Sequence, residues 1–257
     1  MKLDQVKAVI TGGASGLGHA TVKKFLENGA SVAIFDFERS TFKDTIKELD
    51  RKFQGRFIFV NVDVTDTKSV EKGIDITIKK FTAINVLVNC AGIAIARKTI
   101  SKDGVHPLDL YKKVIDVNLI GTFNMVRLTA SVMERNSISS TGEKGCIINT
   151  ASVAAFDGQK GQAAYAASKG GVASSTLPLA RDMAASAIRV NAIAPGLFLT
   201  PMLEGLPAEA QTELAHQVVF PKRLGHPDEF AKLALFIVNS EYMNGETVRI
   251  DGAIRLP

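Results

Sequence analysis

The chain has 257 residues, of which 46% are hydrophobic and 22% are charged, and its mean hydropathy is +0.13. These values exclude a disordered chain, and no apolar run is long enough for a membrane-spanning helix, so membrane insertion is not expected. The length suits a single α/β domain, residues 1–257, better than two small ones. The net charge of +5 is spread along the chain, so it attracts an anionic cofactor, an acidic thioester or RNA without distinguishing between them.

Short runs rich in Val and Ile alternate with longer helical patterns along the chain. Several of these runs lack polar alternation, as expected of parallel strands that are buried on both faces. Strands are predicted at 7–11, 31–35, 56–62, 85–89, 146–150, 188–194 and 247–251. Helices are predicted near 15–28, 40–53, 67–80, 108–134, 162–185 and 227–239. The alternation predicts an α/β Rossmann doubly wound fold, in which a seven-stranded parallel sheet is flanked by helices on both faces.

A glycine-rich loop in the stretch VITGGASGLGHA joins the first predicted strand to the first helix. Its glycines Gly12, Gly16 and Gly18 allow the backbone to turn sharply and to approach a pyrophosphate closely. The helix that follows offers free N–H groups and the positive end of its dipole to the same anion. The loop therefore predicts a dinucleotide site, and the alternative is a glycine-rich turn with a packing role only.

Acidic residues end the second and third predicted strands. Asp36 lies where the adenosine ribose of a dinucleotide is expected, and its carboxylate favours NAD because it repels the 2′-phosphate of NADP. Arg39 is the one contrary sign, since a basic residue attracts that phosphate. Asp63 is either a helix N-cap or an acceptor for the adenine amino group, with Val64 packed on the ring.

Three segments are predicted to be irregular. Residues 96–107 follow the fourth strand and residues 135–145 precede the fifth, and loops of this length in compact domains tend to be functional or mobile. Residues 194–210 follow the sixth strand, at the carboxyl end of the sheet where ligands of open α/β sheets bind. This third segment is expected to be a substrate lid, and a plain surface excursion is the alternative.

The stretch QAAYAASKGG contains small residues with one tyrosine and one lysine, Tyr165 and Lys169. Residues four apart on a helix lie on one face, so the two side chains can meet. They are either polar tips on a closely packed helix or a phenol whose acidity is tuned by an ammonium group.

Cys90 and Cys146 are predicted to be reduced and buried, and no metal site is expected.

Taken together, these motifs resemble the short-chain dehydrogenase/reductase family over essentially the whole chain. The family's T-G-x3-G-x-G pattern matches Thr11 to Gly18, and its N-N-A-G element appears as NCAG at 89–92, with Cys90 replacing the second Asn. Its other motifs appear as DVNLIGTF with Asn118, NTAS with Ser152, the Tyr165–Lys169 pair, Pro195–Gly196, and Asp251–Gly252 followed by Ala253 instead of a second Gly.

Within the family the chain is similar to a subgroup, the type 2 3-hydroxyacyl-CoA dehydrogenases, also called type 10 17β-hydroxysteroid dehydrogenases. The stretches that carry this likeness are ITGGASGLG, VNCAGIA, INTASVAAF, GQAAY, ASKGG, APGLF and RIDGAIR. The resemblance implies reversible NAD-linked oxidation of 3-hydroxyacyl-CoA, with steroids as side substrates. It also implies a homotetramer, tRNA-processing partners and the mitochondrial matrix, or the cytoplasm if the chain is bacterial.

The resemblance also implies roles for individual residues. Tyr165 is the expected general acid/base, with the Lys169 ammonium and a positive nicotinamide ring lowering its pKa by about 3 units, or about 4 kcal/mol. Ser152 is expected to hydrogen-bond the substrate oxygen, and Asn118 either orders a proton-relaying water at a helix kink or is a buried amide bonded to backbone. The expected catalytic residues are Ser152, Tyr165, Lys169 and Asn118.

The expected binding residues fall into two groups. The expected cofactor-binding residues are Gly12, Ser15, Gly16, Leu17, Gly18, Asp36, Asp63, Val64, Cys90, Ala91, Gly92, Tyr165, Lys169, Pro195, Phe198 and Thr200. The expected substrate-binding residues are Ser152, Gln159, Gln162 and Leu203.

Three other functions compete with an NAD-dependent 3-hydroxyacyl-CoA dehydrogenase. One is an NADPH-linked 3-oxoacyl-carrier-protein reductase, against which Asp36 argues. Another is a general steroid or secondary-alcohol dehydrogenase, because pocket shape decides the substrate. The third is a scaffold that binds RNA or protein in tRNA maturation, for which Arg97, Lys98 and Lys102 supply basic charge and against which an intact Ser152, Tyr165 and Lys169 argue.

Overall fold

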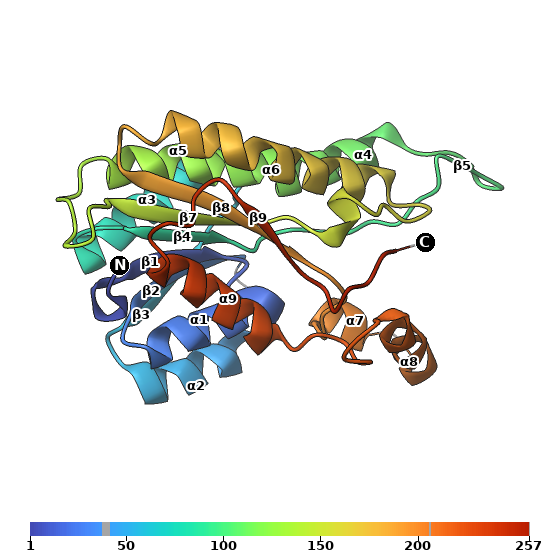
Figure 1. Cartoon of the computed structure of the whole chain (residues 1–257), viewed down its shortest axis with the longest axis horizontal. Coiled ribbons are helices and arrows are strands. Elements are labelled where there is room, and N and C mark those ends of the chain that lie inside the picture. Colours follow the sequence, from blue (N-terminus) through green and yellow to red (C-terminus); the bar gives the residue numbers. More distant parts are fainter. Residues whose placement is uncertain (38–41, 206, 257) are drawn as a thin grey trace.

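A parallel sheet of seven strands forms the centre of the part of the chain that the computed structural model describes, which is residues 1–37, 42–205 and 207–256 (Figure 1). The strand order is β3-β2-β1-β4-β7-β8-β9, and each neighbouring pair is parallel. The strands are β1 (Lys7–Thr11), β2 (Ser31–Asp36), β3 (Phe57–Asn61), β4 (Val86–Asn89), β7 (Gly145–Thr150), β8 (Ile188–Pro195) and β9 (Thr247–Ile250). This arrangement confirms the predicted doubly wound α/β fold.

Helices cover both faces of the sheet (Figure 1). One face carries α1 (Gly16–Glu27), α2 (Lys43–Phe53) and α9 (Pro227–Asn239), and the other carries α3 (Thr67–Phe81), α4 (Leu108–Ile115), α5 (Gly121–Met133) and α6 (Ala163–Asp182). Successive residues of β1 point into the two opposite hydrophobic cores. Ile10 packs in the same core as Phe25 of α1, and Val9 packs in the same core as Met125 of α5. Apolar residues are therefore needed at consecutive positions, which explains why these strands lack polar alternation.

Helix α6 presents a stripe of small buried side chains to the sheet. Its buried members recur every four residues, at Ala164, Ser168, Val172, Thr176 and Ala180. Because these side chains are short, the helix packs closely on its neighbours, and α6 contacts both β8 and α4. Tyr165 and Lys169 each follow one member of the stripe, so both side chains leave the helix beside its buried face.

The helix predicted at 108–134 is divided in the structure. α4 ends at Ile115, a π-helical turn (η3) spans Asp116–Ile120, and α5 begins at Gly121. Such wide turns lengthen the spacing of the backbone hydrogen bonds and are frequent at functional sites. The turn brings Asn118 into the interior, where its side chain is fully buried.

The predicted loops contain short regular elements. Residues 96–107 include an antiparallel hairpin of β5 (Ile100–Ser101) and β6 (Gly104–Val105), which projects from the body of the molecule (Figure 1). The first two residues of the predicted 194–210 lid belong to β8, and the rest includes α7 (Pro201–Glu204) and the start of α8 (Ala208–Gln217). A periodicity search cannot detect two-residue strands or one-turn helices.

Two one-turn 3₁₀ helices complete the elements used below, η1 (Leu3–Gln5) and η4 (Val153–Ala155). In the described part of the chain, no helix is both long enough and apolar enough to cross a membrane. Arg39 and the first residues of the helix predicted at 40–53 lie outside the described residues.

Candidate active site

A cavity of about 500 Å³ opens at the carboxyl ends of the parallel strands. It lies between the loops that follow β1 and β4, where the strand order reverses direction, and open α/β sheets bind ligands at such a point. The cofactor-binding and substrate-binding residues expected from the sequence all line this cavity. Of the expected catalytic residues, Ser152, Tyr165 and Lys169 line it and Asn118 lies behind its wall.

The glycine loop packs too closely on neighbouring backbone to accept a side chain. Gly12 has a φ of +63°, and a Cβ there would stand 2.8 Å from the backbone nitrogen of Ala91. A Cβ on Gly18 would overlap the carbonyl of Gly12. Because the loop carries so little bulk, its backbone and the first N–H groups of α1 stay open to a ligand, which is the arrangement that a pyrophosphate requires.

Thr11 joins the glycine loop to the NCAG segment. Its hydroxyl oxygen accepts hydrogen bonds from the backbone N–H groups of Cys90 and Ala91, each at 3.1 Å. The two segments come from neighbouring strands, β1 and β4, which pair in register at Thr11 and Asn89. The side chain of one threonine thus holds together two walls of the cavity.

Asp36 is held in place by backbone. Its Oδ2 accepts from the N–H of Ala14 at 3.0 Å, and its Oδ1 accepts from the N–H of Phe37 at 2.8 Å. Each carboxylate oxygen retains capacity to accept further hydrogen bonds toward the cavity. A ribose with two free hydroxyls fits these acceptors, and a phosphate does not.

The expectation that Asp63 caps a helix is wrong. The N-cap of α3 is Asp66, whose side chain accepts from the N–H of Lys68 at 2.9 Å. Asp63 instead accepts from the backbone N–H and the hydroxyl of Thr65. Its carboxylate therefore tightens the turn after β3, at the edge of the cavity.

Cys90 occupies the wall of the cavity as a protonated thiol. Burial raises its pKa to about 11, and the hydroxyl of Thr150 points at its sulfur at 3.7 Å. Both cysteines are free, and burial also raises the pKa of the Cys146 thiol to about 11. Neither thiol is activated for nucleophilic chemistry.

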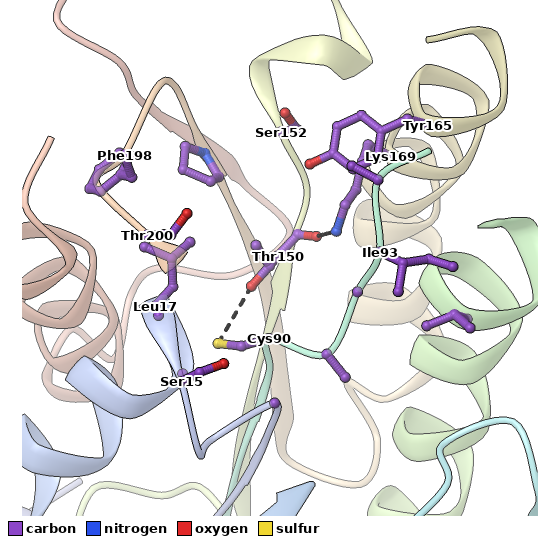
Figure 2. Close-up of a pocket in the computed structure, with 18 of the residues that line it drawn as sticks. Ser15, Leu17, Cys90, Ile93, Thr150, Ser152, Tyr165, Lys169, Phe198 and Thr200 are labelled. Carbon is purple, nitrogen blue, oxygen red and sulfur yellow. Dashed lines mark hydrogen bonds between the residues drawn. The ribbon is translucent and has the colours of Figure 1, made fainter. Parts of the chain in front are cut away.

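Ser152, Tyr165 and Lys169 converge on one side of the cavity (Figure 2). Ser152 ends the loop after β7, and its hydroxyl oxygen accepts from the N–H of Ala154 at 3.1 Å, which fixes its rotamer. Lys169 Nζ donates to the carbonyl oxygen of Thr150 at 2.6 Å and lies 5.9 Å from the centre of the Tyr165 ring. The ammonium group therefore stands beside the phenol without contacting its oxygen.

The expected lowering of the tyrosine pKa is not produced by the protein alone. Burial raises the pKa of Tyr165, and a hydrogen bond with Ser152 offsets only part of this rise. Burial also lowers the pKa of Lys169 to about 8, because desolvation disfavours its charged form. A positive charge beside the phenol would lower the pKa of Tyr165, because it favours the phenolate.

Asn118 fixes the segment that follows NCAG. Its Oδ1 accepts from the N–H of Ile93 at 2.8 Å, and its Nδ2 donates to the carbonyl of Ile93 at 2.9 Å and to the hydroxyl of Ser168 at 3.1 Å. The buried amide thus links the π turn to the cavity wall and to α6. The expected helix distortion and the expected amide bonded to backbone are both observed at this residue, and the proton-relaying water stays a prediction.

The substrate side of the cavity includes three residues that the sequence analysis missed. Thr150 supplies the carbonyl that holds Lys169, Ile93 is positioned by Asn118, and Leu256 reaches the cavity from the end of the chain. Thr150 lies two residues before Ser152 in the NTAS motif and was detectable there. Leu256 has no local signal, because its place depends on how the tail folds back.

Comparisons with known proteins agree with this geometry. A family model described as "Enoyl-(Acyl carrier protein) reductase" matches residues 12–254. The chain is 51% identical to the rat 3-hydroxyacyl-CoA dehydrogenase type-2 over 97% of this chain and 95% of the relative.

Two solved structures are also similar. The 3-hydroxyacyl-CoA dehydrogenase type-2 of Mycobacterium avium has a TM-score of 0.90 and 38% identity, over 97% of this chain and 96% of that one. A short-chain dehydrogenase/reductase of Burkholderia xenovorans, described as putative, has a TM-score of 0.83 and 31% identity, over 95% of this chain and 96% of that one. With the motifs and the cavity described above, the chain belongs to the short-chain dehydrogenase/reductase family and is an oxidoreductase that uses a nicotinamide cofactor.

Proposed function

We propose that this chain is an NAD-dependent 3-hydroxyacyl-CoA dehydrogenase, which reversibly oxidises the 3-hydroxyl group of its substrate to a 3-oxo group. The proposal takes residues 1–257 as one dehydrogenase domain and residues 194–210 as its substrate lid. The observation that carries it is a single cavity that holds the glycine loop, Asp36 and Tyr165 together. The printed names of the rat relative and the Mycobacterium avium structure support the substrate class.

The cofactor end of the cavity fits NAD. The loop between Gly12 and Gly18 would hold the pyrophosphate, and Asp36 would accept the adenosine ribose hydroxyls with the acceptor capacity that Ala14 and Phe37 leave free. Asp63 and Val64 line the cavity near this end and would meet the adenine. A 2′-phosphate would place its negative charge beside the Asp36 carboxylate, so NADP is disfavoured.

The catalytic end would carry out proton transfer. A bound nicotinamide supplies the hydride acceptor for oxidation and the hydride donor for reduction. Tyr165 takes the proton of the substrate hydroxyl during oxidation and returns it during reduction, and Ser152 hydrogen-bonds the same oxygen as its charge changes. Lys169 adds positive charge beside the phenol, which favours the phenolate.

Asn118 would act through other groups. Its hydrogen bonds to Ile93 and Ser168 would keep the cavity wall at a fixed separation from α6, the helix that carries both Tyr165 and Lys169. An ordered water that relays protons past Asn118 stays a prediction from the family resemblance.

The test is a set of initial rates of the wild-type protein with acetoacetyl-CoA, with NADH and NADPH in parallel. We expect rapid turnover with NADH and much slower turnover with NADPH. A strong NADPH preference would instead favour a 3-oxoacyl-carrier-protein reductase and would indicate that Arg39 outweighs Asp36.

A second arm separates the substrate classes. A 3-oxo steroid or a simple secondary alcohol replaces the thioester at equal concentration, with NADH or NAD as required. Turnover of the steroid without turnover of acetoacetyl-CoA would replace the proposed substrate. Tight NADH binding without turnover of any of these compounds would support the scaffold alternative.

We also propose a homotetramer. Apolar side chains on the α4–α6 layer are exposed in the single chain, among them Ile120, Phe123 and Leu177, with exposed fractions of 51%, 49% and 44%. Several such side chains on one face favour association with another copy. Sedimentation equilibrium should give a mass near four chains, and a mass of one or two chains would contradict the proposal.

The mitochondrial matrix and tRNA-processing partners are proposed from the subgroup resemblance alone. If tRNA binds through the basic residues of the β5–β6 hairpin, its affinity should fall steeply as salt rises, because phosphate contacts release counterions. Binding that is insensitive to salt, or that survives removal of Lys98 and Lys102 charges, would contradict this interaction. Import of the chain into isolated mitochondria tests the compartment.

A further inference from the structure

Arg249 binds two carboxylates and a carbonyl at the substrate end of the molecule. Its Nη2 lies 2.6 Å from Asp157 Oδ2, and its Nε lies 2.7 Å from Asp251 Oδ2. Nη2 also donates to the carbonyl of Ile254 at 3.1 Å. One half-buried guanidinium thus joins strand β9 to two segments on either side of it.

The first segment is the substrate loop, defined as residues 156–162. Asp157 lies in this loop two residues before Gln159, which lines the cavity as does Gln162 at the end of the loop. The backbone N–H of Asp157 donates to the carbonyl of Val153, so the loop begins from η4, directly after Ser152. The Phe156 ring lies under the Arg249 guanidinium, with its centre 5.4 Å from Cζ.

The second segment is the tail, defined as residues 251–256. Asp251 Oδ1 accepts from the N–H of Ala253 at 2.9 Å, which turns the chain back toward the cavity. Ile254 is buried at the turn, and Leu256 lines the cavity beyond it. Arg249 therefore holds both the start of the tail, through Asp251, and its middle, through Ile254.

The tail also touches the start of the lid segment and the chain just after α8. A Cβ on Gly196 would stand 2.8 Å from the Cβ of Asp251, so the lid leaves β8 in contact with Asp251. The carbonyl of Gly252 accepts from the N–H of Phe220 at 3.1 Å, just after α8 ends at Gln217. The substrate loop, the tail and the start of the lid thus meet around one cation.

Loss of this cation has a specific electrostatic consequence. Asp157 and Asp251 would face each other across the space that the guanidinium fills, with like charges and reduced access to water. Arg255 would not replace it, because its guanidinium contacts Asp251 at 3.2 Å, is mostly exposed, and has no recorded contact with Asp157 among the described residues. Arg249 is thus the cation that connects the loop to the tail.

We propose that Arg249 is a positioning residue for the substrate: by binding Asp157 and Asp251 together, it holds the substrate loop and the tail as one wall of the cavity. The proposal rests on the proposed dehydrogenase function, since it assigns the wall to the acyl chain of the thioester. Arg249 acts on substrate binding through Gln159 and Leu256, and it leaves the cofactor end and Tyr165 unaffected.

The kinetic test compares Arg249→Met with the matched control Arg255→Met, which removes a guanidinium from Asp251 only. Acetoacetyl-CoA and a longer 3-oxoacyl-CoA are reduced with NADH at a temperature where circular dichroism shows each variant folded. For Arg249→Met we expect KM to rise about 10-fold or more while kcat changes less than about 3-fold, the signature of lost binding in both ground and transition states. The rise should differ between the two chain lengths, and NADH affinity should be unchanged.

A second variant tests the pair itself. Asp157→Asn should raise KM as Arg249→Met does, and the double variant should add little, because both changes break the same link. Arg255→Met should stay within about 2-fold of the wild type in KM, as expected for an exposed ion pair. Equal falls in kcat for both substrates with unchanged KM, or additive effects in the double variant, would overturn the proposal.

Hydrogen exchange separates this inference from the proposed function. Peptides that cover the substrate loop and the tail should exchange faster together in Arg249→Met, while peptides from α1 should not change. This readout needs no substrate. An inactive wild type would therefore contradict the proposed function, while hydrogen exchange would still test whether Arg249 links the substrate loop to the tail. Faster exchange in the tail alone would contradict the link.

Discussion

The glycine loop at 12–18 and the substrate loop at 156–162 line the same cavity, yet they are held in place differently. The glycine loop is fixed by backbone packing against Ala91 and by the Thr11 hydroxyl, contacts between neighbouring strands of the sheet. The substrate loop is tied by a half-buried ion pair whose partners, Asp157 and Arg249, lie 92 residues apart. Added side-chain atoms in the glycine loop should therefore disturb the cofactor end. A change of charge in the ion pair should instead alter the substrate loop without disturbing the packing of the sheet.

Tyr165→Phe tests the point where the two ends meet, and it should have the largest effect. Without the hydroxyl no proton transfer is available, so kcat should fall about 10³-fold. NADH affinity should change little, because the ring stays in place. The fluorescence of NADH is excited where protein side chains do not absorb, so it can be used to measure binding.

Tyr111→Phe is the matched control for this change. Tyr111 stacks edge-to-face on His106, and the residues that line the cavity do not include it. A Tyr165→Phe protein that keeps more than about a tenth of wild-type kcat would remove Tyr165 from the role of general acid/base, since that role contributes at least about 10²-fold.

Gly18→Ala tests the packing of the cofactor end. The added methyl group would overlap the carbonyl of Gly12, so the loop must move, at a cost of about 1–3 kcal/mol. We expect a lower Tm and a Kd for NADH that is raised about 10-fold or more, by the same 1–3 kcal/mol. Binding is measured by NADH fluorescence and stability by thermal unfolding.

Gly170→Ala gives the comparison, because Gly170 lies in α6 beside Lys169 and a Cβ there meets only the Ala155 carbonyl, at 3.9 Å. Alanine at that site should raise stability by up to about 1 kcal/mol, since it restricts the unfolded chain. If both alanine variants bind NADH equally well, close backbone packing is not what shapes the cofactor end.

Asp36→Asn tests whether charge selects the cofactor. Removal of the carboxylate charge should lower the ratio of kcat/KM for NADH over NADPH about 10-fold, because two like charges a few ångströms apart repel by more than 1 kcal/mol near a protein surface. Asp63→Asn is the control, since Asp63 lines the cavity but binds Thr65 in its own turn. A ratio that changes equally in both variants would contradict selection by Asp36.

The pH dependence of stability should show the smallest effect, and it reports on Lys169. Its pKa in the folded protein is about 8, below the ordinary value of 10.5, so above pH 8 the unfolded chain holds a proton that the folded chain has lost. Lys169 should therefore contribute a rise in stability of about 1 kcal/mol between pH 7.5 and 9, seen as the difference between the wild type and a variant without this amine. Urea unfolding at several pH values measures it.

The comparison protein is Lys169→Met, in which this rise should be absent. From about pH 8 upward the buried thiols Cys90 and Cys146, with pKa values of about 11, act in the opposite direction, because the unfolded chain loses thiol protons that the folded chain keeps. Both proteins contain these thiols, so the difference between their profiles isolates Lys169. The raised pKa of Tyr165 adds to that effect at still higher pH. A wild type and variant with parallel pH profiles below pH 9 would indicate that Lys169 keeps an ordinary pKa.

Elements that depend on neighbours in the chain were predictable. Each strand of the main sheet lies within one or two residues of its prediction, because burial on both faces demands an uninterrupted apolar run such as that around Ile10. The glycine loop was predictable because its conformation needs residues without side chains at fixed positions. The Tyr165–Lys169 pair was predictable because a spacing of four places both side chains on one side of a helix.

Features that depend on distant residues were not predictable in this way. The π turn at Asn118 follows from hydrogen bonds to Ile93 and Ser168, which lie 25 and 50 residues away. No local pattern contains those partners.

By itself, then, the sequence determined the order of the main strands and helices, the glycine loop and the identity of many of the residues that meet in the cavity. Only the tertiary structure decided that Lys169 rests on the Thr150 carbonyl, that burial raises the pKa of Tyr165, and that Arg249 joins Asp157 to Asp251. The physical reason is range: local propensity and periodicity act over a few residues, whereas desolvation and ion pairing depend on which distant segments the fold brings together.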